Sequence, residues 1–315
     1  MDLDDDVPVS PAMNTRNVTM TKLHKVTVAA LLLASAGITV PAAAQGAPVY
    51  WDRARGELSE GAGAPDQTSM LSAINTGSTT QLFSVLEYGE RVECGACVPL
   101  LEEKLLTSDD AKVREISAWW LRRRIFASHI VMRHMKNVLA TDTDAVRRSR
   151  AAEAIGEFMD INGLPALASA VAADVDARVR EASVRGIARI NAPSGNALIA
   201  TALGDTDVSV RRAAVSAVLR VNFFRNVDAL VPLLADTDAT VRRNTARAIG
   251  ELRVAGAEAT LSGLLRGDSD RLVRQAAAWA LGRIHSAAAI TALTEATTET
   301  DSLVQDAIDI ARVMR

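Results

Sequence analysis

The sequence has little excess charge of either sign. Its formal net charge is −3 at pH 7 over 315 residues. Beyond residue 44 there are 32 lysines and arginines against 34 aspartates and glutamates. Because nucleic-acid binding by electrostatics needs a strong basic excess, this balance argues against a nucleic-acid partner.

The signatures of common catalytic sites are also missing. The sequence has no phosphate-binding glycine loop and no evident Ser-His-Asp arrangement. No segment shows the alternating pattern or the β-branched runs that are typical of strands. Lysine is scarce beyond residue 44, where only Lys104, Lys112 and Lys136 occur. We therefore expect an all-α, non-enzymatic protein whose basic residues are almost all arginine, and we expect no cofactor.

The N-terminal region predicts export. A short basic start, Met20–Lys25, precedes Val26–Val40, which is mostly apolar and uncharged, and Pro41–Gln45 then supplies an Ala-x-Ala site. This pattern is that of a secretory signal peptide over residues 20–44, cleaved after Ala44. The apolar run is short for a bilayer span, so we expect a periplasmic or secreted protein with no stable membrane span after cleavage. An uncleaved signal anchor is the alternative.

The remaining boundaries follow from composition. Residues 1–19 are acidic and unlike a signal start, which indicates an over-extended or disordered beginning, with true initiation at Met20. Residues 45–67 are rich in glycine, alanine and proline and predict a flexible lead-in. Residues 68–106 are helical in pattern but off-period, as expected for an N-terminal helical cap and a first helix, because terminal repeats must close the stack. Residues 107–315 hold the repeats.

An aspartate recurs at gaps of 34, 32, 31, 31, 32 and 31 residues, which predicts a solenoid. The series is Asp110, Asp144, Asp176, Asp207, Asp238, Asp270 and Asp301. Four residues after each stands an arginine, namely Arg114, Arg148, Arg180, Arg211, Arg242 and Arg274, with Gln305 in the last unit.

Each unit reads as two helices. Asp238 is a good N-cap, because its carboxylate can accept hydrogen bonds from the free N–H groups of a helix start and suits the helix dipole. Val241, Ala246 and Ile249 then share one helical face. Small residues fill the middle of this face and allow close approach of helices: Ala151, Ser183, Ala214 and Ala277. A glycine follows in three units, at Gly156, Gly250 and Gly282.

A second apolar run follows a short polar turn, for example in 229–234 and 259–265. We therefore expect two helices of about ten to fifteen residues in every unit. One such pair cannot bury its own apolar face, so neighbouring units must stack into one continuous core.

The phrase Asp-Thr-Asp-Ala-Thr-Val-Arg-Arg-Asn-Thr-Ala-Arg-Ala-Ile-Gly, at 236–250, resembles a HEAT repeat. More narrowly, it is similar to the short HEAT-like type of the phycobilisome lyases. The resemblance runs from about Asp109 to the C-terminus and implies a right-handed α-solenoid of stacked two-helix repeats. It also implies that the recurring aspartates and arginines form a structural ladder between helices: Asp144/Arg148, Asp176/Arg180, Asp207/Arg211, Asp238/Arg242 and Asp270/Arg274.

Paired aspartates form a second repeated feature along the chain. The pairs are Asp142/Asp144, Asp174/Asp176, Asp205/Asp207, Asp236/Asp238 and Asp268/Asp270. Carboxylate rows can bind calcium, but these loops are short and lack a distal glutamate and the glycine of a calcium loop. We interpret them as helix caps and solubilising charge.

Cys94 and Cys97 form the only cysteine pair, near an expected helix start. In an oxidising compartment the simplest expectation is a local disulfide that pins the cap. A redox-active pair with a lowered thiol pKa, a metal site and inert thiols are the alternatives. Haem attachment is disfavoured because Val98 stands where it would require histidine.

Histidines and methionines gather in one expected helix, at His129, Met132, His134 and Met135. The spacing matches no known ligand motif, and methionines there more often fill gaps in the core, so we predict no metal site. Deoxyhypusine hydroxylases, a HEAT-like enzyme family, hold iron with His-Glu dipeptides. None of the four histidines here precedes a glutamate, which excludes that activity.

In HEAT-like repeats the helix that begins at the aspartate lines the concave surface, and residues five, nine and thirteen positions on point outward. Here these positions form an arginine lane with a tryptophan near each end. We predict partner contacts from Arg185, Arg189, Arg212, Arg220, Arg243, Arg247, Arg283, Trp119 and Trp279. The competing interpretation is a solvated face whose charges pair within helices, as in Glu181/Arg185 and Arg247/Glu251. Phe223 and Phe224 fall in a turn, where we expect burial rather than an exposed anchor.

These patterns favour an exported, non-enzymatic adaptor that holds a protein or peptide, possibly acidic, along its concave face. One alternative, suggested by repeat type alone, is a bilin-lyase-like enzyme or ligand carrier, for which only Cys94 and Cys97 offer reactive groups. The other is a structural subunit of an envelope complex.

Overall fold

The computed structural model describes residues 64–314. The chain divides into two units, Met1–Ala47 and Pro48–Arg315, and everything described below belongs to the second. The predicted signal peptide at 20–44, residues 1–19 and nearly all of the lead-in at 45–67 lie outside the described residues. Within 64–314 the structure is all-helical and contains no strand, as the sequence predicted.

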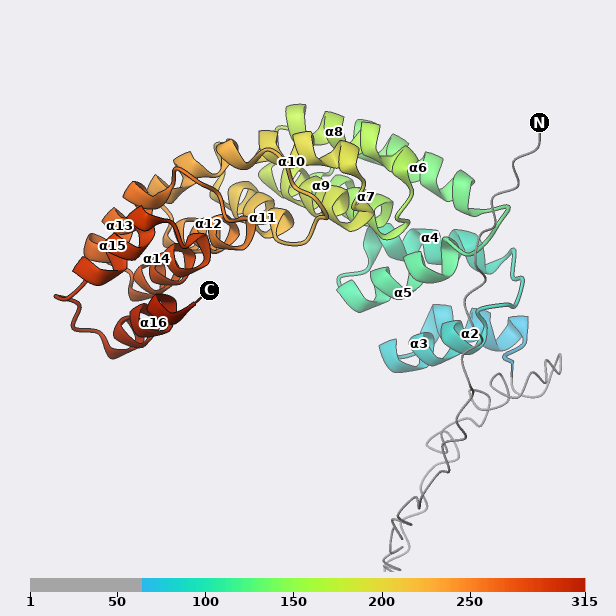
Figure 1. The fold of residues 1–315 in the computed structure, drawn as a ribbon. Helices are drawn as coiled ribbons and strands as arrows, with labels where there is room; N and C mark the ends of the chain where they lie inside the picture. The colour runs from blue at the N-terminus through green and yellow to red at the C-terminus, as the bar shows by residue number, and fades with distance from the viewer. Residues whose placement is uncertain (1–63, 315) are drawn as a thin grey trace, which may run out of the picture. The chain divides into compact units, whose positions relative to one another are not determined.

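Two layers of helices build the repeats (Figure 1). The first helices of successive units, each beginning at a recurring aspartate, are α5 (Ala111–Leu121), α7 (Ala145–Glu157), α9 (Ala177–Ile190), α11 (Val208–Val218), α12 (Ala239–Leu252), α14 (Arg271–Ile284) and α16 (Ser302–Val313). The second helices are α6 (Ser128–Thr141), α8 (Leu164–Ala173), α10 (Asn196–Ala202), α13 (Glu258–Gly267) and α15 (Ala287–Glu295). Helices α2 (Gln67–Thr76), α3 (Thr79–Tyr88) and α4 (Cys97–Thr107) precede them.

The unit that begins at Asp207 departs from the two-helix expectation. Its second element is a pair of short 3₁₀ turns, η4 (Val227–Ala229) and η5 (Val231–Ala235), so the predicted helix there is wrong. Pro232 removes a backbone donor from this short run. The second helix of the preceding unit, α10, is also shorter than expected and follows the 3₁₀ turn η3 (Pro193–Gly195). The apolar residues still fill the core, because Leu230, Leu233 and Leu234 are buried.

The recurring aspartates are N-caps, as predicted. Every first helix begins after one of them, and each carboxylate accepts hydrogen bonds from N–H groups in the first turn. Hydrogen bonds from the Arg178 side chain and then from the Arg178 N–H lower the pKa of Asp176 to about 2. Asp176 therefore stays ionised well below neutral pH, and like the other caps it satisfies N–H donors that the helix itself cannot.

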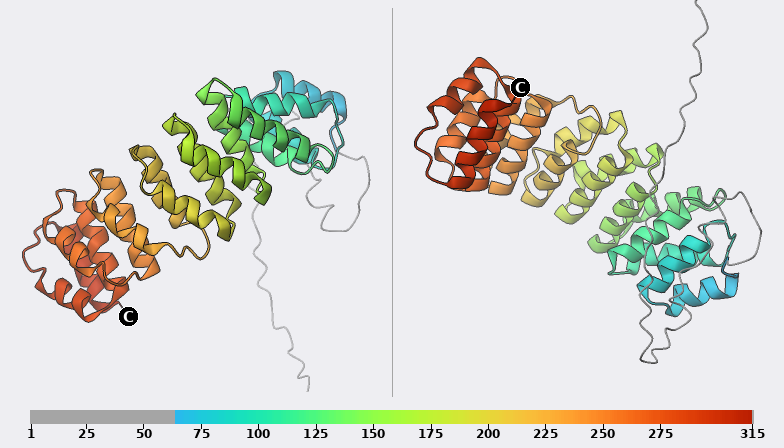
Figure 2. Two further views of the ribbon diagram at one scale, coloured as in Figure 1. Left: turned by 90° about the horizontal axis from the view of Figure 1, so that it is seen from above. Right: turned by 60° about the horizontal axis from the view of Figure 1, so that its bottom comes forward.

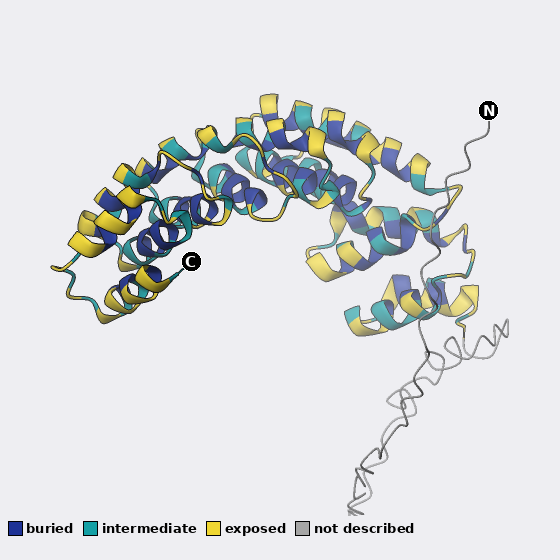
Figure 3. Cartoon of the chain, in the orientation of Figure 1, coloured by how far each residue is buried: buried dark blue, intermediate teal, exposed yellow. Residues whose placement is uncertain are grey.

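First helices approach one another closely at small residues. Ala151, Ser183, Ala214 and Ala277 are completely buried, and Figure 3 shows burial concentrated on the facing sides of the stacked helices. A Cβ on Gly156 of α7 would lie 2.5 Å from the Cα atom of Gly186 in α9. Glycine is therefore required here by packing against the neighbouring backbone. The two further views in Figure 2 show the helices stacked side by side along the repeats.

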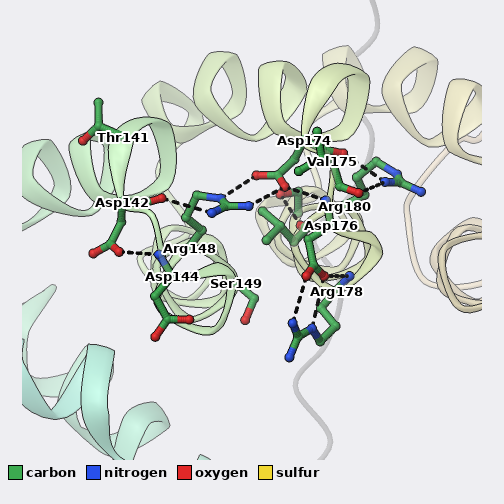
Figure 4. Close-up of polar contacts among 12 residues, drawn as sticks. Thr141, Asp142, Asp144, Arg148, Ser149, Asp174, Val175, Asp176, Arg178 and Arg180 are labelled. Atoms are coloured by element: carbon green, nitrogen blue, oxygen red, sulfur yellow. Dashed lines mark hydrogen bonds and ion pairs between the residues drawn. The ribbon is translucent and has the colours of Figure 1, made fainter.

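Arginine ladders tie neighbouring units together, through different aspartates from those expected. Arg148 donates from Nε and Nη2 to the carboxylate of Asp174 at 2.8 and 2.9 Å, and from Nη1 to the carbonyl oxygen of Asp142 at 3.0 Å (Figure 4). The same rung recurs as Arg180–Asp205, Arg211–Asp236, Arg242–Asp268 and Arg274–Glu299. The acceptor is the first aspartate of the next unit's pair, or Glu299 in the last unit, whereas the second aspartate caps the helix.

The first rung is built differently. Asp142 is bound by Arg147 of α7 at 2.9 Å, and Arg114 of α5 instead contacts Glu153 of α7 at 2.9 Å. The regular ladder therefore starts at α7 and continues to the segment before α16.

The segment before α4 is held by covalent and polar contacts. Cys94 and Cys97 form a disulfide, and both are buried. Trp120 of α5 donates from Nε1 to the carbonyl oxygen of Gly89 at 3.0 Å. The buried side chain of Arg124 donates to the carbonyl oxygen of Val92 at 2.9 Å. These contacts fix the α3–α4 connection against the first repeat.

Candidate functional site

The predicted arginine lane lies on the exposed side of the first helices. We call this side of α5, α7, α9, α11, α12 and α14 the first-helix face. Arg185 and Arg189 come from α9, Arg212 and Arg220 from or just beyond α11, and Arg247 from α12, and all five are exposed. Arg243 and Arg283 are half-buried, as are Trp119 and Trp279. The aspartate N-caps set the phase of each helix, which is why these positions emerge on one side.

Two hollows lie along this face. One, of about 560 Å³, lies between α9 and α11 and is lined by Arg185, Arg189, Arg212 and Arg220 together with Glu181. The other, of about 270 Å³, extends toward α5 and α7 and shares three arginines with the first hollow, Arg185, Arg189 and Arg220. It adds the carboxylates of Glu115, Glu153 and Glu157. Charged side chains therefore border both hollows.

Several lane arginines are neutralised within the protein. Arg185 pairs with Glu181 on its own helix, as the competing interpretation anticipated. Arg189 contacts Glu157 at 2.7 Å. Arg212 donates from Nε to Asp238 at 2.9 Å. Partial exposure makes such pairs weak contributors to stability, and they can exchange for a ligand carboxylate.

Three lane arginines remain without a carboxylate. Among the described residues, Arg220, Arg243 and Arg247 form no ion pair or side-chain hydrogen bond. The predicted Arg247/Glu251 pair is wrong, because Glu251 lies 3.8 Å from Arg283 of the next first helix instead. The buried Nε of Arg243 also has no hydrogen-bond partner. Because buried donors normally have an acceptor, the Nε–H of Arg243 is a donor that a ligand carboxylate could use.

Glutamates stand beside arginines at one end of the face. Glu115, Glu153 and Glu157 gather on α5 and α7, whereas the arginines dominate from α9 to α12. Burial raises the pKa of Glu157, against the opposing effect of Arg189. The sequence pattern contained these glutamates at the same phase as the arginines, so their place on the face could have been read from it.

The two tryptophans are less available than the sequence suggested. The guanidinium of Arg123 stacks 3.9 Å from the centre of the Trp119 ring. Trp279 packs on α12, where a Cβ on Gly250 would lie 2.6 Å from its ring. Both rings therefore use part of their surface inside the protein.

The histidines, methionines and cysteines that the sequence offered as candidates do not form one site in the structure. Met132 and Met135 are buried in the core, as expected, whereas His129 is exposed. His134 contacts Glu102 through Nδ1 at 2.6 Å. No cluster of three metal-ligating side chains occurs among residues 64–314. Cys94 and Cys97, the reactive groups that a lyase-like activity would need, are enclosed in their disulfide.

Phe223 and Phe224 differ in burial. Phe224 is buried as predicted, but Phe223 is 82% exposed, so the expectation of burial is wrong for Phe223. Its backbone φ of 58° places it in the left-handed region. The Phe-Phe dipeptide alone does not indicate that Phe223 adopts this backbone angle.

Comparison with known proteins agrees with the architecture. Residues 227–311 match the protein family described as HEAT repeats. The crystal structure of YibA from Escherichia coli is similar with a TM-score of 0.52 and 18% identity, over 79% of this chain and 93% of that one. At this identity the likeness shows the fold alone. No curated protein sequence matches.

Weaker structural similarities carry no argument about this chain. Human deoxyhypusine hydroxylase in complex with glycerol has a TM-score of 0.35 and 19% identity, over 78% of this chain and 94% of that one. The complex of CpcE and CpcF of phycocyanin lyase from Nostoc sp. PCC7120 has a TM-score of 0.39 and 18% identity, over 69% of this chain and 94% of that one.

Proposed function

We propose that this chain, which is a HEAT-repeat protein, is an exported, non-enzymatic scaffold that holds an acidic protein segment along its first-helix face. HEAT repeats suggest a helical scaffold that binds partners. The observation that supports an acidic partner is a set of three arginines without a carboxylate partner: Arg220, just beyond α11, and Arg243 and Arg247 on α12. Export rests on the signal-peptide pattern at residues 20–44.

The geometry supports a partner with a particular charge order. Acidic side chains over α9 to α12 would form charge-assisted hydrogen bonds with guanidinium groups, which bind carboxylates in a bidentate manner. Basic side chains of the same segment would meet Glu115 and Glu153 over α5 and α7. Exposed ion pairs of the arginine lane, such as Arg189–Glu157, can break, and their members can then bind acidic or basic side chains of the partner.

Charge reversal tests this proposal. The variant Arg220→Glu/Arg247→Glu is expected to weaken binding of a fluorescein-labelled polyglutamate peptide at least about tenfold, because two charge-assisted contacts become repulsive. Fluorescence anisotropy at low salt measures the affinity. Both side chains are exposed, so the thermal unfolding midpoint should hardly change.

A matched control separates the face from net charge. Arg266→Glu/Arg271→Glu makes the same charge change at two exposed arginines outside the lane. This control should bind the peptide within about twofold of the wild type, because distant exposed charges are screened. Equal loss in both double variants would refute binding at the first-helix face. Recovery of a cell-envelope protein by the wild type, but not by the face variant, would then identify the partner.

A further inference from the structure

Exposed apolar side chains concentrate at one edge of the repeats. We call this the turn edge: the segments that connect each first helix to its second element, 122–127, 158–163, 191–195, 219–226, 253–257 and 285–286. Of the eleven large apolar residues that are exposed within 64–314, six lie in these segments: Ile125, Phe126, Met159, Ile161, Leu219 and Phe223. Only Val175 lies in the aspartate loops at the opposite ends of the first helices.

Direct contacts join neighbouring turns at two places along this edge. Arg122 donates from Nη1 to the carbonyl oxygen of Glu157, at the end of the next first helix, at 2.7 Å. Further along, the N–H of Asn222 donates to Oδ1 of Asn191 at 2.9 Å. Asn196 then donates from Nδ2 to the carbonyl oxygen of Phe223 at 3.0 Å. The turn that carries Ile125 and Phe126 thus lies next to the end of α7, and the turn that carries Phe223 lies next to Asn191.

The exposure of the tips is nearly complete. Ile125, Phe126 and Phe223 are 82%, 83% and 82% exposed. Aromatic and aliphatic side chains of this size normally bury most of their surface, and a row of them marks an interaction site. The exposed apolar tips do not line the hollows of the first-helix face, although Arg220 and Asn191 of the turn segments do.

The two edges of the repeats differ in charge. The six turn segments contain Arg122, Arg123, Arg124, Arg220, Arg225 and Arg253 and a single acidic residue, Asp160. Arg225 and Arg253 are exposed and have no carboxylate partner among the described residues. The loops that begin the first helices carry the Asp-x-Asp pairs and contain no lysine or arginine.

We propose that the turn edge docks on an anionic lipid surface. Phe126, Ile125 and Phe223 insert among the acyl chains, while Arg225 and Arg253 contact headgroup phosphates. Interfacial binding combines buried apolar area with attraction between basic side chains and anionic lipids, and this edge supplies both.

A lipid surface fits this edge better than a folded protein does. The apolar tips project singly from separate turns, and a protein would need several pockets at matching spacing to receive them. Lipid needs no such match, because acyl chains adapt to each tip. No helix within 64–314 is long and apolar enough to cross a membrane.

Vesicle sedimentation of the full chain tests the proposal. Vesicles of phosphatidylcholine with phosphatidylglycerol should bind the wild type more tightly than vesicles of phosphatidylcholine alone. Phe126→Ser/Phe223→Ser should weaken binding to the anionic vesicles at least about tenfold, because two inserted rings are lost. Arg225→Glu/Arg253→Glu should remove the preference for anionic vesicles.

Matched variants isolate the turn edge from the rest of the chain. Val175→Ser removes an apolar side chain that is 91% exposed at the opposite edge and should leave binding unchanged. All variants share residues 1–63, so differences between them report on the edge. Equal loss with Val175→Ser, or wild-type binding by the Phe126/Phe223 variant, would overturn the proposal. If the wild type does not bind vesicles but forms dimers, and Phe126→Ser makes it monomeric, the edge serves self-association instead.

Discussion

Replacing Arg211 with alanine is expected to lower the free energy of unfolding by about 3 kcal/mol. Arg211 binds Asp236 through Nε at 2.6 Å and Nη2 at 3.0 Å, and its Nη1 donates to the carbonyl oxygens of Asp205 and Thr206. The Asp236 side chain is only 6% exposed, so the variant leaves a carboxylate with little access to water. Urea unfolding followed by circular dichroism measures the loss.

The adjacent arginine provides the control for this rung. Arg212 pairs with Asp238, but its side chain is 47% exposed. Arg212→Ala should therefore cost less than about 1 kcal/mol. The double variant Arg211→Met/Asp236→Leu should recover most of the lost stability, because no charge then remains buried. Equal costs for the two single alanine variants would contradict the ladder as a source of stability.

The rung also makes stability depend on pH. Burial alone would raise the pKa of Asp236, but hydrogen bonds from Arg211 and from the N–H of Asp238 outweigh it, and the pKa lies below its usual value. A depressed folded pKa means that the stabilisation is present above the unfolded pKa, about 3.9, and is lost as pH falls through the folded pKa. The Arg211→Ala variant should therefore lose less stability on acidification than the wild type.

Adding one methyl group at Gly156 should destabilise the protein by about 2 kcal/mol, although alanine is the better helix former. The new Cβ would lie 2.5 Å from the Cα atom of Gly186, so α7 and α9 would have to move apart. A flexible side chain could rotate away from such a contact, but backbone cannot. The thermal unfolding midpoint should fall.

Gly263 offers a control with the opposite sign. It lies within α13, and a Cβ there would meet no atom within 4 Å. Gly263→Ala should raise stability by about 0.5–1 kcal/mol, because it removes backbone freedom from the unfolded chain at no steric cost. If Gly156→Ala also raised the midpoint, close contact between first helices would not be what requires glycine at position 156.

Local patterns in the sequence were sufficient for most of the architecture. A capping aspartate acts within one helical turn, so its role at Asp238 followed from its own neighbours. The role of Asp236 did not, because its partner Arg211 is 25 residues away. Both residues of the pair had looked like caps. A regular spacing between Arg211 and the first aspartate of the next pair was the available signal.

The candidate site shows the same limit. Which arginines face outward followed from helical phase, but which remain without a carboxylate depended on the neighbouring helix. Glu251 pairs across to Arg283 rather than along its own helix to Arg247. The shortened second element at Val231–Ala235 was likewise invisible in an apolar run that fits a helix equally well.

The ladder has a direction, and this gives each repeat two complementary ends. An arginine reaches forward to the next unit, while the first aspartate of the pair receives the arginine from the unit before. In a whole repeat inserted between two others, the first aspartate would bind the arginine of the preceding unit, and the arginine would bind the first aspartate of the following unit. Duplication or excision in register would thus leave no unmatched charge, so the length of such a protein can change by whole repeats without redesign of the joints.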